Sequence, residues 1–483
     1  MHRALTIPEL VHKILYEAAH RGTQLKLALT CRAFYEPAMD LVWSLQYELI
    51  NLVKCLPRDL WRVSGSGTTL TLREPTRPTT PQDWERFDFY ARRVRSLRHD
   101  HPLSRVISEK LFRWLFSSRP THQLLPKLSV LRWTKDMADT YYDAIAMLYG
   151  PRLSILVIGS GRYGFISSHT ISPALLQLHQ RAPNIQVLQV LMPDVGFSMP
   201  IHIEFFTPLQ KLTTLRLGAT LPVNFDVLAK LSVMPHLREV DIVVVHNSQV
   251  PPDLSHHNLI DVPLSSTQTD NPGLALQHTN GCEHRRRPFI TGEESDPREE
   301  GQQPITVASF RRFCDFHNLQ RVEFLTEMCI TLDDDTLKEM AMAWPQLQQL
   351  ELKSIAEYPW RTPTATTLEG VAHVARYCPL LSKFTIDVNT TSTDISSHAR
   401  PGGGHCNRTL QKIAFGQSSA LGSPAKIAAF LFAIFPNLQR INMGDETRLG
   451  ESWRPVEEMV HVLRIASQWP KPSGELTPQL EAL

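Results

Sequence analysis

A short apolar pattern recurs along most of this 483-residue chain, and it constrains the fold more than any other feature. In its clearest copy, Pro345 stands two residues ahead of a hexapeptide L-x-x-L-x-L that runs from Leu347 to Leu352. The alternation at the end of the hexapeptide predicts a short strand with one buried face. The proline predicts the end of a preceding helix, because its ring clashes with helical carbonyls and it has no N–H to donate. Each copy therefore predicts a helix, a stop and a strand.

Ten copies of the hexapeptide occur, and seven of them have a proline at the same offset. The apolar triplets are Leu128/Leu131/Trp133, Leu153/Leu156/Ile158, Ile185/Leu188/Val190, Leu212/Leu215/Leu217, Leu237/Val240/Ile242, Leu319/Val322/Phe324, Leu347/Leu350/Leu352, Leu381/Phe384/Ile386, Leu410/Ile413/Phe415 and Leu438/Ile441/Met443. Apart from one wide gap, successive copies begin 25 to 34 residues apart, near the roughly 20–29 residues of a leucine-rich repeat. An ordinary α/β domain also alternates strands with helices, but it does not reuse one proline-anchored pattern. We therefore expect an α/β repeat solenoid: a leucine-rich-repeat horseshoe with parallel strands on its concave face and helices on its convex face.

The composition restricts the partners and the compartment. With 42% apolar and 20% charged residues, the chain as a whole is expected to be globular. Its 50 Lys and Arg nearly cancel 48 Asp and Glu, so no global field draws it to nucleic acid or to a membrane, and we expect neither as a partner. Seven cysteines without C-x-x-C spacing and a first segment without a signal-peptide run predict an intracellular protein, cytoplasmic and/or nuclear.

Residues 1–56 predict a module of three amphipathic helices. Thr6 and Glu9 form a capping box at the start of the first helix. A short second helix is expected around Leu25–Leu29, and a third is expected from residue 37 to residue 56, where Pro57 stops it. Helices this short bury little apolar surface among themselves, so they need a partner or the repeat array.

Several segments of this module resemble an F-box: Ile7-Pro8-Glu9-Leu10, Ile14-Leu15, Leu27 to Phe34, Pro37-Ala38 and Leu41-Val42-Trp43. The whole chain resembles the fungal F-box proteins that carry leucine-rich repeats behind this module. In that family the F-box binds the Skp adaptor of a cullin-based (SCF) ubiquitin ligase, and the repeats select a protein substrate. The resemblance implies an adaptor-binding surface at Ile7, Pro8, Glu9, Leu10, Ile14, Leu15, Leu27, Ala28, Cys31, Arg32, Phe34 and Trp43.

The resemblance implies that the chain is a substrate-recognition subunit, whose partners are a Skp-type adaptor with its cullin ligase and an unknown target protein. The alternative is an interaction scaffold of leucine-rich repeats with no ubiquitin-ligase role. In that case the three helices only cap the first repeat, as any solenoid requires for solubility.

The composition divides the rest of the chain. Residues 57–83 are rich in Gly, Ser and Pro and predict a linker, and residues 84–470 form the repeat array. The wide gap holds a polar segment without periodicity, residues 247–304, which predicts a disordered insertion that could hide a degenerate repeat. Residues 390–407 are a second, loop insertion, whose three consecutive glycines predict a flexible loop. Residues 471–483 form a carboxy-terminal tail.

Strand alternation predicts which residues a partner of the array would meet. The residue between the last two apolar positions of each hexapeptide, and the residue one pleat earlier, point away from the core. The candidate residues on the concave face are Arg132, Arg216, Glu239, Asp241, Arg321, Glu323, Glu351, Lys383, Lys412 and Arg440. They predict an acidic middle beside a basic flank, which suits a partner of complementary charge. Ordinary solvated charge on strand surfaces is the equally simple alternative.

No Ser/His/Asp, Cys/His or paired-carboxylate arrangement stands out, so we expect no catalytic residues and no enzymatic activity. The contrasting hypothesis is a nucleotide-dependent enzyme, because Gly159 to Gly164 read G-x-G-x-x-G directly after a predicted strand. A dinucleotide site needs a helix that begins within this motif, whereas the next helix signal is Pro173. We therefore expect no cofactor.

Two clusters of potential metal ligands have simpler explanations. Asp333–Asp335 head a predicted helix, where negative charge stabilises the amino terminus. His256, His257, Cys282 and His284 lack the paired spacing of a zinc site. We therefore expect no metal.

Overall fold

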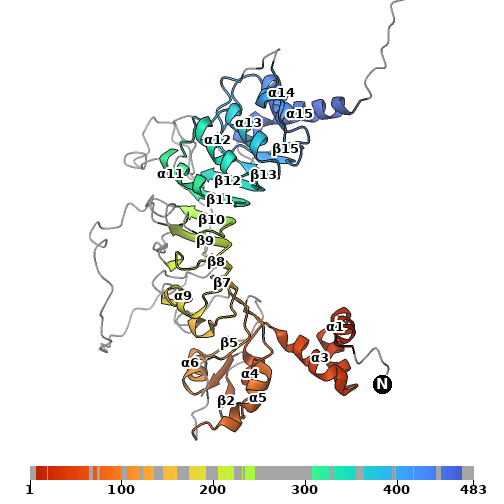
Figure 1. Ribbon diagram of the computed structural model, residues 1–483, viewed down its shortest axis with the longest axis vertical. Coiled ribbons are helices and arrows are strands. Elements are labelled where there is room, and N and C mark those ends of the chain that lie inside the picture. Colours follow the sequence, from red (N-terminus) through yellow and green to blue (C-terminus); the bar gives the residue numbers. More distant parts are fainter. Residues whose placement is uncertain are drawn as a thin grey trace, which may run out of the picture. The chain divides into compact units, whose positions relative to one another are not determined.

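The computed structural model of the protein describes residues 7–18, 20–64, 69–72, 77–99, 106–119, 123–134, 145–159, 173–191, 205–221, 231, 234–244, 307–326, 330–354, 364–393, 395, 399–416, 418–441 and 448–469. Within these residues, 12 parallel strands form a single open sheet, so the repeats build an α/β solenoid (Figure 1). The strands follow chain order across the sheet: β1 (Leu45–Gln46), β4 (Ser96–His99), β6 (Val130–Trp133), β7 (Ile155–Gly159), β8 (Val187–Leu191), β9 (Thr214–Leu221), β10 (Glu239–Val244), β11 (Arg321–Thr326), β12 (Gln349–Ser354), β13 (Lys383–Thr385), β14 (Lys412–Ala414) and β15 (Arg440–Ile441). Each of the ten hexapeptide copies supplies one strand, which confirms the predicted array of parallel strands.

The register of the sheet follows the hexapeptide. The middle apolar residue of one copy lies opposite that of the next, as in the row Leu215, Val240 and Val322. The same alignment runs from Leu131 on β6 to Ile441 on β15. Every described member of the apolar triplets is buried in one continuous core. Alternation explains this result, because residues two apart on a strand share one face.

Helices connect successive strands and supply the other side of the core. They are α6 (Glu109–Ser117), η2 (Ala146–Leu148), α9 (Leu178–Arg181), α11 (Val307–Arg311), η5 (Arg312–Asp315), α12 (Asp334–Ala343), α13 (Leu368–Tyr377) and α14 (Pro424–Ile434), and α15 (Arg448–Gln468) follows the last strand. The residue before the proline joins one repeat to the previous one: the Nε1 of Trp344 donates to the carbonyl of Phe313 at 3.1 Å. Cys378 has the same place before Pro379, and its Sγ donates to the carbonyl of Ala341 at 3.6 Å.

The amino-terminal module has three helices, but the predicted third helix is too long. The helices are α1 (Pro8–Glu17), α2 (Arg21–Ala28) and α3 (Arg32–Ser44). The apolar spacing up to Leu56 is compatible with a helix, yet Leu45 and Gln46 pair with Ser96 and Leu97 as the first strand of the sheet. Pairing with β4 outweighs the local helical pattern, and a separate short helix, α4 (Ile50–Val53), follows. Thr6 lies outside the described residues, and α1 has Ile7 at its N-cap without a side-chain cap.

Residues 57–83 are not a linker. They contain β2 (Trp61–Ser64) and β3 (Thr69–Leu72), which pair antiparallel, and the start of α5 (Pro81–Ala91). In the described part of the chain, β3 also pairs with β5 (Val106–Ile107), giving a second sheet of three strands. Proline is typical of linkers, but here Pro81 stands in the first turn of a helix.

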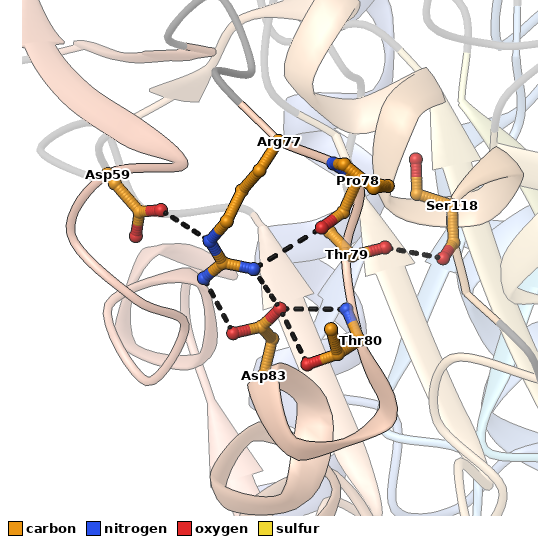
Figure 2. Close-up of polar contacts among 7 residues, drawn as sticks. All are labelled: Asp59, Arg77, Pro78, Thr79, Thr80, Asp83 and Ser118. Atoms are coloured by element: carbon orange, nitrogen blue, oxygen red, sulfur yellow. Dashed lines mark hydrogen bonds and ion pairs between the residues drawn. The ribbon is translucent and has the colours of Figure 1, made fainter.

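A polar network ties the end of this segment in place (Figure 2). The guanidinium of Arg77 binds Asp83 at 2.6 Å and Asp59 at 3.2 Å. Asp83 also accepts from the N–H of Thr80 at 2.8 Å, completing a capping box at the start of α5. The hydrogen bonds from Arg77 and from the Thr80 backbone hold the pKa of Asp83 well below its usual range.

Residues 390–407, expected as a flexible loop insertion, instead form the connection of one repeat. The 3₁₀ turn η6 (Pro401–Gly404) contacts both α13 and α14. Gly402 has a positive φ of 64°, and an added Cβ would lie 3.2 Å from Cγ2 of Ile434. The buried Asn407 donates to the carbonyls of Cys378 and Leu381 and accepts from the N–H of Leu410. Glycine permits the tight backbone approach here, so it marks packing and not mobility.

All of the polar insertion at 247–304, with the histidines and the cysteine noted above, and all of the tail at 471–483 lie outside the described residues. The structure still bears on a hidden repeat. Strand β10 pairs directly with β11 along its whole length, from Glu239 opposite Arg321 to Val244 opposite Thr326. Strands β10 and β11 are therefore direct neighbours in the sheet.

Candidate interaction surfaces

The predicted adaptor-binding residues fall into two groups. Those on the surface of the helical module are Ile7, Pro8, Glu9, Leu10, Ile14 and Arg32. Those packed inside the module are Leu15, Ala28 and Phe34, which are buried, and Leu27, Cys31 and Trp43, which pack against them. The second group holds the three helices together, and its buried members Leu15, Ala28 and Phe34 are not available to a partner in this conformation.

The exposed group contains an apolar stripe, defined here as Ile7, Leu10 and Ile14. Their exposed fractions are 44%, 40% and 42%. Spacings of three and four residues place them on one face of α1 and its N-cap. The adjacent face carries Val11 and Leu15, which are buried in the module. The stripe is therefore not needed to hold α1 in place.

Sequence reasoning missed other exposed apolar residues of the module: Tyr16, Leu25, Leu29 and Tyr35. Leu29, at the C-cap of α2, is 84% exposed. The sequence contained a signal for two of them, since Leu25 and Leu29 are four residues apart and therefore lie on one face of α2 and its C-cap. The buried residue of α2 is Ala28, so this face is left exposed.

Different residues attach the module to the sheet. The buried Arg93, after α5, forms ion pairs with Asp40 and, at 2.5 Å, with Glu36 on α3. The ring of Trp43 stacks on Tyr90 with centroids 4.3 Å apart. Because α3 also runs directly into β1, changes in the apolar stripe leave this attachment untouched.

The polar face of the sheet, defined here by the residues predicted for the concave face, has the predicted columns. Glu239 lies opposite Arg321, while Asp241 lies between Arg216 on β9 and Glu323 on β11. Glu323 in turn lies opposite Glu351 on β12. Neighbouring strands are about 4.8 Å apart, so these charges interact strongly across the sheet.

The acidic middle is neutralised by cations of the same face. Arg216 binds Glu239 at 3.0 Å, and Arg321 lies 3.6 Å from Glu323. Glu351, only 1% exposed, forms ion pairs with both Lys353 and Lys383. Burial by itself raises the pKa of Glu351, but the two lysines outweigh it and lower that pKa below its ordinary value. Lys353 was missed, because it lies on the same strand beyond the hexapeptide.

Asp241 is the exception on this face. In the described part of the chain its carboxylate has no hydrogen bond or ion pair within contact distance. Burial and the neighbouring charge of Glu323 raise the pKa of Asp241 to about 6, against the opposing influence of Arg216 and Arg321. The basic flank of Lys383, Lys412 and Arg440 is neutralised only in part: Lys383 is paired with Glu351, whereas among the described residues Lys412 and Arg440 form no ion pair, and both are exposed.

The sites considered for nucleotides and metals have structural roles where they are described. Gly159 ends β7, and an added Cβ would overlap the carbonyl oxygen of Leu191 on β8. The rest of that glycine motif lies outside the described residues. Asp333 caps α12, accepting from the N–H of Thr336 at 2.8 Å. Asp334 accepts from Thr367 of the next repeat at 2.7 Å.

Within the described ranges, no three His, Cys, Asp or Glu side chains form a group that could hold a metal ion. None of the described helices combines the length and the apolar character that a membrane crossing requires.

Comparison with known proteins gives fold-level likeness at most. No family model matches the chain, and no curated protein matches its sequence. Among solved structures, a chain of the Rad7 and Elc1 complex from yeast is 12% identical with a TM-score of 0.34, over 72% of this chain and 69% of that one. A chain of the Toll–Spatzle complex from Drosophila is 11% identical with a TM-score of 0.32, over 72% and 38% of the two chains. Similarity at this level carries no information on function.

Proposed function

We propose that the chain is a substrate-recognition subunit of a cullin-type ubiquitin ligase, in which the helical module docks on a Skp-type adaptor as an F-box. The observation that carries the proposal is the apolar stripe of Ile7, Leu10 and Ile14, which lies exposed on a helix that already buries Val11 and Leu15 on its adjacent face. Burying an apolar side chain is worth about 1.5–3 kcal/mol, so a partner that covers the stripe gains affinity.

In this proposal the solenoid is a leucine-rich-repeat horseshoe that holds the target protein, and the chain itself is not an enzyme. Its effect is proximity, since holding a target beside the ligase raises the effective concentration of the target's lysines at the ubiquitin-charged enzyme. The proposal also places the protein inside the cell, where such ligases work.

The test is a pull-down of purified full-length chain with a Skp-type adaptor, comparing the unmodified chain with Leu10→Glu/Ile14→Glu. Affinity should fall at least about 100-fold, because each charge in an apolar interface costs about 1.4 kcal/mol or more. The matched control is Met342→Glu/Val462→Glu, which places the same charges on exposed apolar residues of α12 and α15.

The control should bind the adaptor normally, and both variants should melt as the unmodified chain does. Undiminished binding by the α1 variant would contradict adaptor docking. It would leave the alternative, a repeat scaffold whose helices only cap the array.

A further inference from the structure

A groove of about 510 Å³ lies at the edge of the sheet where the strands begin. Arg95, Ser129, Ser154 and Gln186 line it, and each directly precedes a strand, from β4 to β8. The turns before these strands complete the wall. We call this feature the edge groove; it uses none of the residues predicted for the polar face.

The edge groove is lined by four cations and no carboxylate. The cations are Arg95, Lys127, Arg152 and Lys211, and all four side chains are exposed. In the described part of the chain, none of these four side chains forms an ion pair. Only the Lys211 side chain donates a hydrogen bond, to Oδ1 of Asn184 at 2.6 Å. Three guanidinium or ammonium groups therefore face solvent with all their donors available.

The wall between the cations is fixed by its own hydrogen bonds. The hydroxyl of Ser129 donates to the carbonyl of Arg95 at 3.0 Å, and that of Ser154 donates to the carbonyl of Ser129 at 3.1 Å. Asn184 donates to the carbonyl of Pro151 at 2.7 Å. These bonds leave the backbone of the groove satisfied, so a ligand would meet a preformed surface.

The repeat itself creates the row of cations. Lys127, Arg152 and Lys211 occupy the same place in their repeats, one residue ahead of the first leucine of the hexapeptide. Stacking of the repeats puts Lys127 and Arg152 ahead of neighbouring strands, whereas Asn184, ahead of β8, lies between Arg152 and Lys211, at about 4.8 Å per strand. Later repeats have His236, Asn318, Gln346, Leu380, Thr409 and Asn437 at this place, so the lysines and arginines are confined to the first half of the sheet.

We infer that the edge groove binds an acidic peptide segment of a partner protein in an extended conformation. An extended chain presents every second side chain on one side, about 6.8 Å apart, so alternate carboxylates can reach the long side chains of Lys127, Arg152 and Lys211 along the groove. Arg95 and Arg152 supply planar guanidinium groups that bind carboxylates through paired hydrogen bonds.

Other polyanions fit the lining less well. Single-stranded nucleic acid is held by cations together with aromatic rings on which bases stack, and no aromatic residue lines the groove. A membrane surface needs apolar side chains to insert, and Pro151 is the one apolar residue of the lining. The inference does not depend on adaptor docking, since the apolar stripe lies on α1 and shares no residue with the groove.

Fluorescence anisotropy with the full-length chain tests the inference. The probe is a labelled eight-residue peptide of alternating glutamate and threonine. Lys127→Glu/Arg152→Glu should weaken its binding at least about tenfold, because two attractive charges become repulsive. The matched control Lys412→Glu/Arg440→Glu changes the net charge equally but on the basic flank, and it should change the affinity less than about twofold.

Added salt should weaken binding of the glutamate–threonine peptide to the unmodified chain, as screening requires. Absence of binding by the unmodified chain at low salt overturns the inference, and so does equal binding of a glutamine–threonine peptide. An equal loss of affinity in the control variant overturns it as well, since the net charge of the whole chain, and not the groove, would then attract the peptide. Tighter binding of an eight-nucleotide oligothymidine, lost in the groove variant, would assign the groove to nucleic acid instead.

Circular dichroism melting of each variant establishes that it is folded. Should the charge reversal unfold the chain, Lys127→Gln/Arg152→Gln replaces it, with an expected loss of about threefold in affinity.

Discussion

The polar face of β9–β13 and the edge groove beside β4–β8 both carry several charges, yet they differ in how those charges are neutralised. On the polar face, Glu239 and Glu351 have cations of the same sheet within contact distance. In the edge groove, Arg95, Lys127 and Arg152 have none among the described residues. Charge in the sequence is thus a poor guide to charge available to a partner.

The difference follows from position on the strand. Residues within a strand have neighbours about 4.8 Å away on both sides, so opposite charges there pair with each other and lose solvent. Residues in the turn before a strand point outward with more room, and their charges stay hydrated. A ligand of the groove would therefore not have to break existing ion pairs, whereas a ligand of the polar face would.

The largest expected effect comes from removing the cations around Glu351. Lys353→Met/Lys383→Met should destabilise the fold by about 2–4 kcal/mol, because it leaves a carboxylate that is 1% exposed without a partner. Urea unfolding at pH 7 measures the loss. The matched control Lys412→Met/Arg440→Met, on the exposed basic flank, should change stability by less than about 0.5 kcal/mol. Equal effects in the two variants would remove the distinction between paired and unpaired charge on this sheet.

A smaller effect concerns Asp241, whose pKa is raised to about 6 in the fold while an unfolded aspartate has a pKa near 3.9. The folded state binds the proton more tightly, so this group adds stability as the pH falls from about 6 to about 4 and removes it as the pH rises. Asp241→Asn should therefore stabilise the protein at pH 7 by about 1 kcal/mol, a figure reduced for the partial exposure of the carboxyl.

The gain from Asp241→Asn should disappear near pH 4, and urea unfolding at pH 7, 5.5 and 4.2 follows it. Lys412→Gln is the control, since its ammonium does not titrate in this range. A stability difference that stays constant with pH would mean that Asp241 is neutralised by its arginine neighbours.

The smallest effect is expected in the edge groove. Lys127→Gln/Arg152→Gln should change the free energy of unfolding by less than about 0.5 kcal/mol, because these cations stabilise nothing in the described structure. Thermal melting at low and high salt measures it. A loss comparable to that of the Lys353 and Lys383 variant would show that the groove cations have structural partners, and the contrast between the two regions would fail.

Much of the array could be predicted because one local rule generates it. A proline that stops a helix and three apolar residues at fixed spacing specify where each strand lies and which side chains are buried. Leu131, Leu215 and Ile413 all lie at the predicted place in the ladder for this reason. The polar columns followed from the same alternation, so their residues could be named in advance.

This local rule does not predict which residue pairs with each polar side chain. Lys353 neutralises Glu351 from outside the hexapeptide, and Leu45 leaves a helical pattern to pair with Ser96, 51 residues away along the chain. Gly402 and Asn407 read as a loose loop until α13 and α14 are brought against them.

The sequence by itself determined the repeat, its register and the apolar core, because those depend on the period of neighbouring residues. Only the tertiary structure decided where α3 ends, which F-box-like residues stay exposed, and which charges remain unpaired. The physical reason is that burial and ion pairing depend on residues brought together from different repeats. The stacking that pairs Glu351 with Lys383 also sets Lys127, Arg152 and Lys211 along one groove whose lining has no carboxylate.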